Sequence, residues 1–239
     1  MESQSPTFEE WRYYCFTQAW EDFSGNDADS WEVGIVRQER FLNLEVSLLA
    51  TYMTRLFESP NSVVEEFTDN QIAKATWFLF GTGSEYIKTV RDSQIPVDLQ
   101  SGCIRSIATM YTNLFDRVCG NRGSDPDSQL YLKHKIDGAV YMIWDMDNLA
   151  GTVMFPDKAP HLVEPGVHIL ETALLKCRTS ACRISALHGI GHIVSVHRAK
   201  KRRDIAPQLQ SFIEKFLERD DVPSWLREYA DCAYHGSVQ

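Results

Sequence analysis

The sequence shows neither an apolar segment long enough to span a membrane nor the pattern of a secretory signal peptide. No apolar run approaches the roughly 20 residues that a membrane-spanning helix needs, and the longest candidate, residues 75–80, ends at Gly81. The first ten residues are acidic and have neither the basic nor the apolar stretch of a secretory signal peptide. We therefore expect a cytoplasmic protein with no membrane partner.

Several catalytic and metal-binding motifs are also missing. The six cysteines form no Cys-x-x-Cys pair, so their spacing matches neither a zinc ribbon nor a dense disulfide framework. No Gly-x-Ser-x-Gly nucleophile motif occurs, and residues 81–83 lack the strand and the Lys-Ser/Thr of a phosphate-binding loop. We expect buried free thiols in a reducing compartment, no catalytic residues and no cofactor.

Positive charge is scarce. Lys and Arg number 24 against 33 Asp and Glu, which gives a formal net charge of −9. Direct nucleic-acid binding needs a positive field and is not expected, although one basic cluster occupies residues 198–203. The charge favours association with a basic protein. Acidic residues are dense in the first quarter, and four of them are candidates for partner binding: Glu21, Asp22, Asp27 and Asp29.

The pattern of apolar residues is helical, and strand-like alternation is scarce. It predicts an all-α fold, a compact array of stacked helical hairpins. We expect a single domain over residues 1–239 with a sub-boundary near 120–127, where glycine, asparagine and proline cluster. Thr7 and Glu10 have the spacing of a capping box at the start of the first helix. The expected helices cover roughly 7–23, 36–57, 69–91 with a break at residues 81–83, 99–119, 128–150, 166–176, 180–196, 205–219 and 223–234, and residues 151–165 are expected to be irregular.

The C-terminal part of the chain resembles one group of proteins. The run Ala186-Leu-His-Gly-Ile-Gly-His192 resembles a segment found late in bacterial HEAT-repeat-like α-helical proteins, and residues 141–145 and 225–239 resemble other stretches of that group. The resemblance covers roughly residues 140–239. It implies a HEAT-like α-solenoid, at least in this part, with a binding role and no catalytic residues. HEAT-like enzymes that bind iron use His-Glu pairs, and this chain has no His-Glu dipeptide.

His188 and His192 are the candidate metal ligands. Four residues apart on a helix, they lie on one side, where two imidazoles can reach one ion. A zinc protease motif would have glutamate after the first histidine, and here that position is Gly189. The local sequence supplies no third ligand, and His168 or Asp145 would be arbitrary choices. We therefore interpret the pair as structural histidines, with a metal site or acid–base catalysis as alternatives.

The two glycines beside these histidines favour the structural interpretation. Gly189 and Gly191 each cost about 1 kcal/mol in a helix relative to alanine. A stable fold keeps that cost where helices approach closely or where a helix kinks. The histidines would then hydrogen-bond the backbone of a neighbouring helix or loop.

A short aromatic and acidic stretch supplies the remaining candidates. Asp145 and Asp147 lie two residues apart and cannot share one helix face, so a cap or loop role is the plainer interpretation. An exposed Trp144 beside such acids would suit a protein interface. Trp144, Asp145 and Asp147 are therefore further candidates for partner binding.

Three functions are consistent with these features. We predict a non-enzymatic protein-binding module, in its most concrete form an immunity-type protein that neutralises a basic toxin such as a nuclease. The first alternative is a metal-dependent helical hydrolase or oxygenase using His188 and His192. The second is a scaffold within a larger bacterial assembly.

Overall fold

The structure, a computed structural model, describes residues 5–17, 19, 39–81, 84–119, 135–146, 149–200 and 205–238. Within these ranges every regular element is helical and no strand occurs, which confirms the predicted all-α class for this part of the chain. None of the described helices is long and apolar enough to cross a membrane. The expected sub-boundary at 120–127 lies outside the described residues.

The helices are mostly short and follow one another closely. One of them, α7, continues through a π-helical turn, η1, into α8. The 3-10 turn η3 extends α9, and the 3-10 turn η4 directly precedes α11. The elements are α1 (Phe8–Thr17), α3 (Val46–Glu58), α4 (Asn61–Glu66), α5 (Asp69–Phe80), α6 (Tyr86–Thr89), α7 (Val97–Met110), η1 (Tyr111–Phe115), α8 (Asp116–Val118), α9 (Lys135–Tyr141), η3 (Met142–Trp144), α10 (Gly151–Met154), η4 (Pro160–Leu162), α11 (Val163–Leu175), α12 (Ser180–Ala199), α13 (Ala206–Leu217) and α14 (Ser224–His235).

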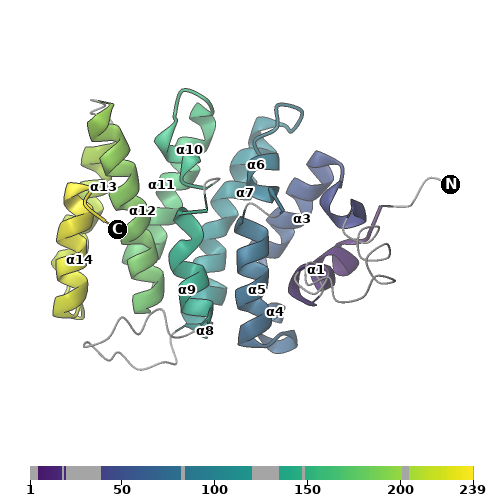
Figure 1. Ribbon diagram of the computed structural model, residues 1–239, viewed down its shortest axis with the longest axis horizontal. Coiled ribbons are helices and arrows are strands. Elements are labelled where there is room, and N and C mark those ends of the chain that lie inside the picture. The colour runs from purple at the N-terminus through teal and green to yellow at the C-terminus, as the bar shows by residue number, and fades with distance from the viewer. Residues whose placement is uncertain are drawn as a thin grey trace, which may run out of the picture.

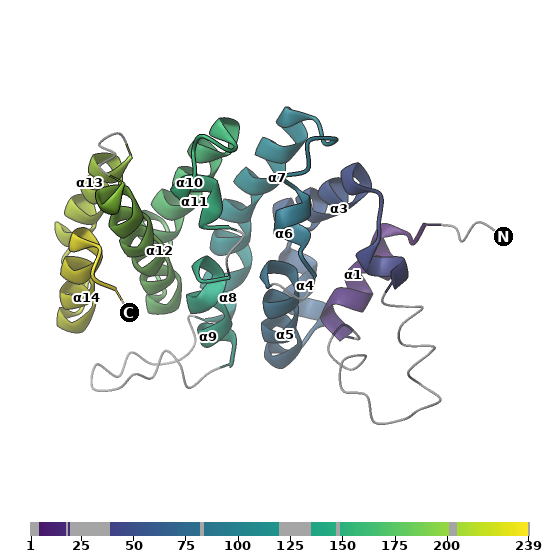
Figure 2. The ribbon, with the colours of Figure 1, turned by 45° about the horizontal axis from the view of Figure 1, so that its top comes forward.

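The longer helices pack in two rows. In one row α3 contacts α7, α7 contacts α11, and α11 contacts α13. In the other row α1 contacts α5, α5 contacts α9, α9 contacts α12, and α12 contacts α14. Both rows run along the long axis of the molecule in chain order, from α1 at one end to α14 at the other (Figures 1 and 2). Contacts of α11 with α12 and of α13 with α14 join the rows, and one hydrophobic cluster extends from Phe8 to Ala233.

Helix starts follow the capping chemistry of the sequence. The Thr7 backbone N–H donates to the Glu10 carboxylate at 2.7 Å, and the Glu10 N–H donates to Thr7 Oγ1 at 3.3 Å, so the predicted capping box is confirmed. The hydrogen bond from the Thr7 backbone is the main cause that lowers the pKa of Glu10. A second capping box, formed by Thr68 and Gln71, begins α5.

Two expected boundaries were wrong. The helix predicted over 36–57 is interrupted before Val46, because the Glu45 carboxylate accepts hydrogen bonds from the backbone N–H groups of Ser47 and Leu48 and so begins a new helix there. Residues 151–165 contain α10 and η4 rather than an irregular stretch. Pro165 lies in the first turn of α11, where a helix needs no backbone N–H donor. The predicted break after residue 80 is confirmed, since α5 ends at Phe80.

Candidate metal centre

The candidate centre lies where α12 meets the end of the α9–η3 segment. The 20-residue helix α12 carries His188 and His192 one turn apart, and Asp145 directly follows η3. A Cβ atom on Gly189 would lie 2.6 Å from both Cγ and Cδ2 of Trp144, so the missing side chain is what lets η3 approach α12. At Gly191 a Cβ would lie 2.6 Å from the methyl groups of Val238. The prediction that these glycines serve close packing is therefore confirmed.

Three side chains converge at this point. The Nε2 atom of His188 lies 2.9 Å from Oδ2 of Asp145, and the Nε2 atom of His192 lies 2.9 Å from Oδ1 of the same carboxylate. The two Nε2 atoms are 3.0 Å apart. Asp145, which the sequence offered only as an arbitrary third ligand, thus joins both histidines.

Two tyrosines hold the opposite side of the His188 ring. Its Nδ1 atom lies 2.6 Å from the hydroxyl of Tyr229 on α14 and 2.9 Å from the hydroxyl of Tyr141 on α9. The two hydroxyls are 3.1 Å apart. The two helices α9 and α14, which both pack on α12, therefore fix the orientation of the His188 imidazole. Its Nε2 atom is directed at Asp145.

Burial sets the charge of His188. His188 is only 1% exposed. This burial lowers the pKa of its imidazole, although the carboxylate of Asp145 acts in the opposite direction. Burial therefore favours the neutral form of His188, which is the form in which imidazole binds a metal ion. His192 and Asp145 keep 33% and 27% of their side chains exposed, so the centre opens toward solvent on their side.

With Asp145 as a carboxylate, hydrogen bonds between neutral groups satisfy at most two of the three contacts. If both Nε2 atoms carry protons and donate to Asp145, two donors face each other at 3.0 Å. If only His192 carries a proton on Nε2, the lone pair of His188 Nε2 faces that of the carboxylate at 2.9 Å. A cation placed among the three groups would be attracted to every one of these lone pairs.

The donor set is that of a divalent transition metal site. Two imidazoles and one carboxylate suit zinc, iron, manganese, cobalt or nickel, and sites of this kind keep open positions for water or substrate. A metal-bound histidine usually hydrogen-bonds a second group through its other nitrogen, and the tyrosines meet that requirement for His188. The partners of these histidines are thus side chains, not the neighbouring backbone that the structural interpretation expected. The other arbitrary choice, His168, lines a separate surface hollow of about 340 Å³ with Glu164 and Glu171.

The partner-binding candidates are placed differently from expectation. Trp144 is 1% exposed and donates from Nε1 to the Tyr111 hydroxyl at 3.2 Å, so it belongs to the core and offers no surface to a partner. Asp145 is part of the centre. The remaining candidates lie outside the described residues: Glu21, Asp22, Asp27, Asp29 and Asp147.

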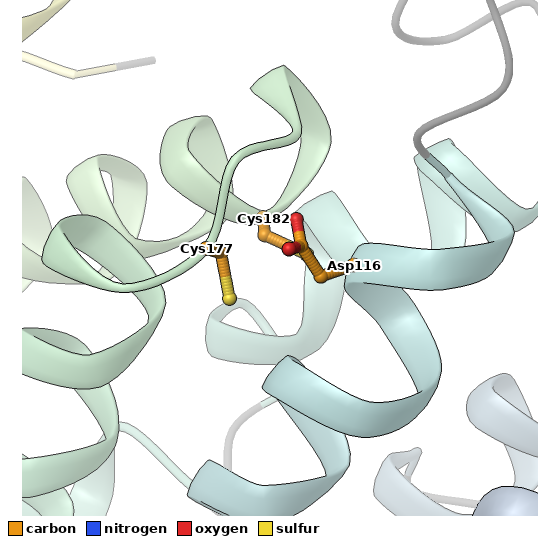
Figure 3. A group of neighbouring side chains, drawn as sticks. All are labelled: Asp116, Cys177 and Cys182. Atoms are coloured by element: carbon orange, nitrogen blue, oxygen red, sulfur yellow. The ribbon is translucent and has the colours of Figure 1, made fainter.

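A second cluster, drawn in Figure 3, has a structural explanation. One ligand atom each from Asp116, Cys177 and Cys182 lies within 4.8 Å of the others. The Asp116 carboxylate, however, accepts hydrogen bonds at 2.8 Å from the backbone N–H groups of residues 178 and 179 and so secures the loop before α12. Burial raises the pKa of the Cys182 thiol, and a protonated thiol is neither a nucleophile nor a metal ligand.

All six cysteines are free, as predicted. Five are buried, and Cys232 on α14 is exposed.

Comparisons with protein-family models, with curated proteins and with solved structures give no match to this chain. The sequence did not reveal Tyr141 or Tyr229 as neighbours of His188. For Tyr141 a signal exists, since it lies four residues before Asp145 in a helical segment, but for Tyr229 no local signal exists.

Proposed function

We propose that this chain is a metal-dependent helical protein, of the hydrolase or oxygenase class, whose centre is formed by Asp145, His188 and His192. The single observation that carries the proposal is the approach of these three side chains to within 2.9–3.0 Å of one another. Partial exposure of Asp145 and His192 gives water and small ligands a route to the ion. An ion held in this way can lower the pKa of bound water or bind a co-substrate at an open position.

The packing of the helices supports a HEAT-like origin for the scaffold. Stacked helical hairpins place alternate helices in two rows, each row running in chain order, which is the pattern of contacts in the described helices. In such a stack, residues far apart in sequence meet on neighbouring helices. Asp145 and His188 meet in this way, so a metal site does not need the His-Glu dipeptide that iron-binding HEAT-like enzymes use.

The metal content of purified full-length protein tests the proposal. We expect a divalent transition metal at a ratio near one per chain by elemental analysis, after purification without chelators or after reconstitution of the apoprotein. Asp145→Ala and His192→Ala should lose this metal while circular dichroism shows an unchanged helix content. A matched control is His235→Ala, which removes an exposed histidine that lies 3.7 Å from Asp231 on α14.

Two outcomes of these measurements would refute different parts of the proposal. Metal retained in both centre variants would place the ion elsewhere and refute the proposed ligands. Apoprotein that neither takes up zinc, iron, manganese, cobalt or nickel nor gains thermal stability from them would refute the metal site altogether. Since any ion that binds the native state alone raises its stability, the thermal shift is an independent readout.

The net charge of −9 favours a second candidate function, immunity-type binding of a basic toxin. We propose it as the alternative to metal-dependent activity, together with the expected cytoplasmic location. Mixing the protein with basic toxins encoded beside its gene tests it, and the idea fails if none is bound or inhibited. A scaffold role would appear instead as a large complex in size-exclusion chromatography of native lysate.

A further inference from the structure

We infer that the centre selects a six-coordinate ion such as Fe(II), Mn(II) or Co(II) over a tetrahedral zinc ion, and that it leaves at least two adjacent coordination positions open for small oxygen-donor ligands. The inference rests on the proposed function and specifies its metal and ligand class. It is carried by the spacing of the donor atoms and by the way their rings are held.

The spacing of the ligand atoms gives the coordination angle. With metal–ligand distances of about 2.1 Å, two ligands at the 90° angle of an octahedral ion lie about 3.0 Å apart. At the tetrahedral angle the same ligands would lie about 3.4 Å apart. The observed separations are 3.0 Å between the Nε2 atoms of His188 and His192 and 2.9 Å from each of these to a different oxygen of the Asp145 carboxylate.

The surrounding structure holds the His188 ring and the backbone beside Asp145. His188 and His192 project from adjacent turns of one helix, and the two tyrosine hydroxyls restrain the His188 ring. Asp145 is placed by Trp144, whose indole packs directly against Gly189. The His188 ring and the backbone that carries Asp145 are therefore held, and their spacing favours the octahedral angle over the tetrahedral angle of zinc.

The number of open positions follows from the carboxylate. Each oxygen of Asp145 faces a different histidine, Oδ2 toward His188 and Oδ1 toward His192. If one oxygen binds, three of six positions stay open, and if both bind, two stay open. His188 is buried on one side, so the open positions face the solvent side, where His192 and Asp145 are exposed. Six-coordinate ions of this class accept water and other small oxygen donors at such open positions.

Cobalt substitution tests the coordination number directly. Full-length apoprotein is loaded with Co(II), the bound metal is quantified by elemental analysis, and the visible spectrum of the same sample is recorded. Tetrahedral Co(II) absorbs visible light much more strongly than six-coordinate Co(II), because a tetrahedral field has no centre of symmetry. We expect weak, six-coordinate bands in the wild type and in His235→Ala, and no bound cobalt in His192→Ala.

Nitric oxide probes the open positions in the Fe(II) form under anaerobic conditions. We expect it to bind and to produce the half-integer-spin electron paramagnetic resonance signal of an iron–nitrosyl complex. Bound cobalt with intense tetrahedral bands, or bound iron that gives no nitrosyl signal, would overturn this inference while leaving a metal site in place. Apoprotein that binds zinc but neither cobalt nor iron would overturn this inference alone, whereas apoprotein that takes up none of zinc, iron, manganese, cobalt and nickel would remove the proposed function as well.

Discussion

Replacing Gly189 with alanine tests whether the contact between α12 and η3 builds the centre. The new Cβ would lie 2.6 Å from Cγ and Cδ2 of Trp144 and 3.0 Å from Cδ1. Ordinary carbon–carbon contacts lie at about 3.5–4.0 Å, so the indole and the helix must separate by about 1 Å. The indole has little freedom to move, because it is buried and donates from Nε1 to the Tyr111 hydroxyl, which in turn contacts Ser185 on α12.

The expected change in stability is the difference of two effects. Overpacking of this kind costs about 1–3 kcal/mol, and alanine gains about 1 kcal/mol over glycine in a helix. Gly102→Ala on α7 isolates the second effect, because a Cβ there would meet nothing within 4 Å. We expect Gly102→Ala to stabilise the protein by about 1 kcal/mol, which raises the melting temperature by about 2–4 °C for a chain of this size. Gly189→Ala should fall about 1–3 kcal/mol below that control.

Denaturant unfolding and metal titration of both variants complete the experiment. Because Asp145 follows Trp144, displacement of the indole should also weaken metal binding in Gly189→Ala, whereas Gly102→Ala should bind metal like the wild type. Equal stability of the two variants would refute the close packing. A destabilised Gly189→Ala variant with unchanged metal affinity would show that the packing does not position Asp145.

Three further predictions follow from named contacts. Tyr229→Phe removes the hydroxyl that lies 2.6 Å from His188 Nδ1 and should lower metal affinity about 10- to 100-fold with little change in helix content. Competitive titration against a chelator measures the affinity, and an unchanged value would contradict the positioning role of Tyr229. Hydrogen bonds from Arg219 and then Arg183 hold the pKa of Asp221 well below its ordinary value. Its contribution to stability is therefore fully present above the unfolded-state pKa of about 3.9 and is lost progressively as pH falls from there through the lowered folded-state pKa. Asp221→Asn should therefore cost about 1 kcal/mol at pH 7, a value reduced for the 54% exposure of the carboxylate, and a smaller amount at pH 2. A pH-independent loss in denaturant unfolding would refute the link. Thr68→Ala removes the capping box of α5 and should cost about 0.5–2 kcal/mol in thermal unfolding, while no change would mean that water satisfies the freed N–H groups.

The sequence predicted best what depends on local chemistry. The helical class, the capping box at Thr7 and the break after Phe80 follow from hydrophobic spacing, cap residues and glycine, all of which act within a few residues. The error at residues 36–57 had a local cause that was overlooked, since Glu45 caps a new helix. The error at 151–165 came from giving prolines more weight than the first turn of a helix requires.

The centre depended on contacts that no local pattern encodes. The spacing of His188 and His192 placed two side chains of the proposed centre on one helix face, but Asp145 lies 43 residues before His188 and Tyr229 lies 41 residues after it. Their approach is decided by how α9 and α14 pack on α12, and periodicity gives only which face of each helix is apolar. The burial of Trp144 was missed for the same reason. An aromatic residue beside acidic residues suits a surface position, and only the structure shows that its indole packs against Gly189.

Close packing and the proposed metal centre at this helix are therefore parts of one arrangement. From the sequence, the glycines beside the histidines argued for helix contact and against chemistry. In the structure, Gly189 admits the indole of Trp144, and the next residue along the chain is Asp145, the carboxylate that meets both imidazoles. A side chain at position 189 would hold η3 away from α12 and with it the third donor. The absence of a Cβ atom at Gly189 thus affects both the packing of η3 on α12 and the position of Asp145. The Gly189→Ala variant measures the first effect as stability and the second as metal affinity.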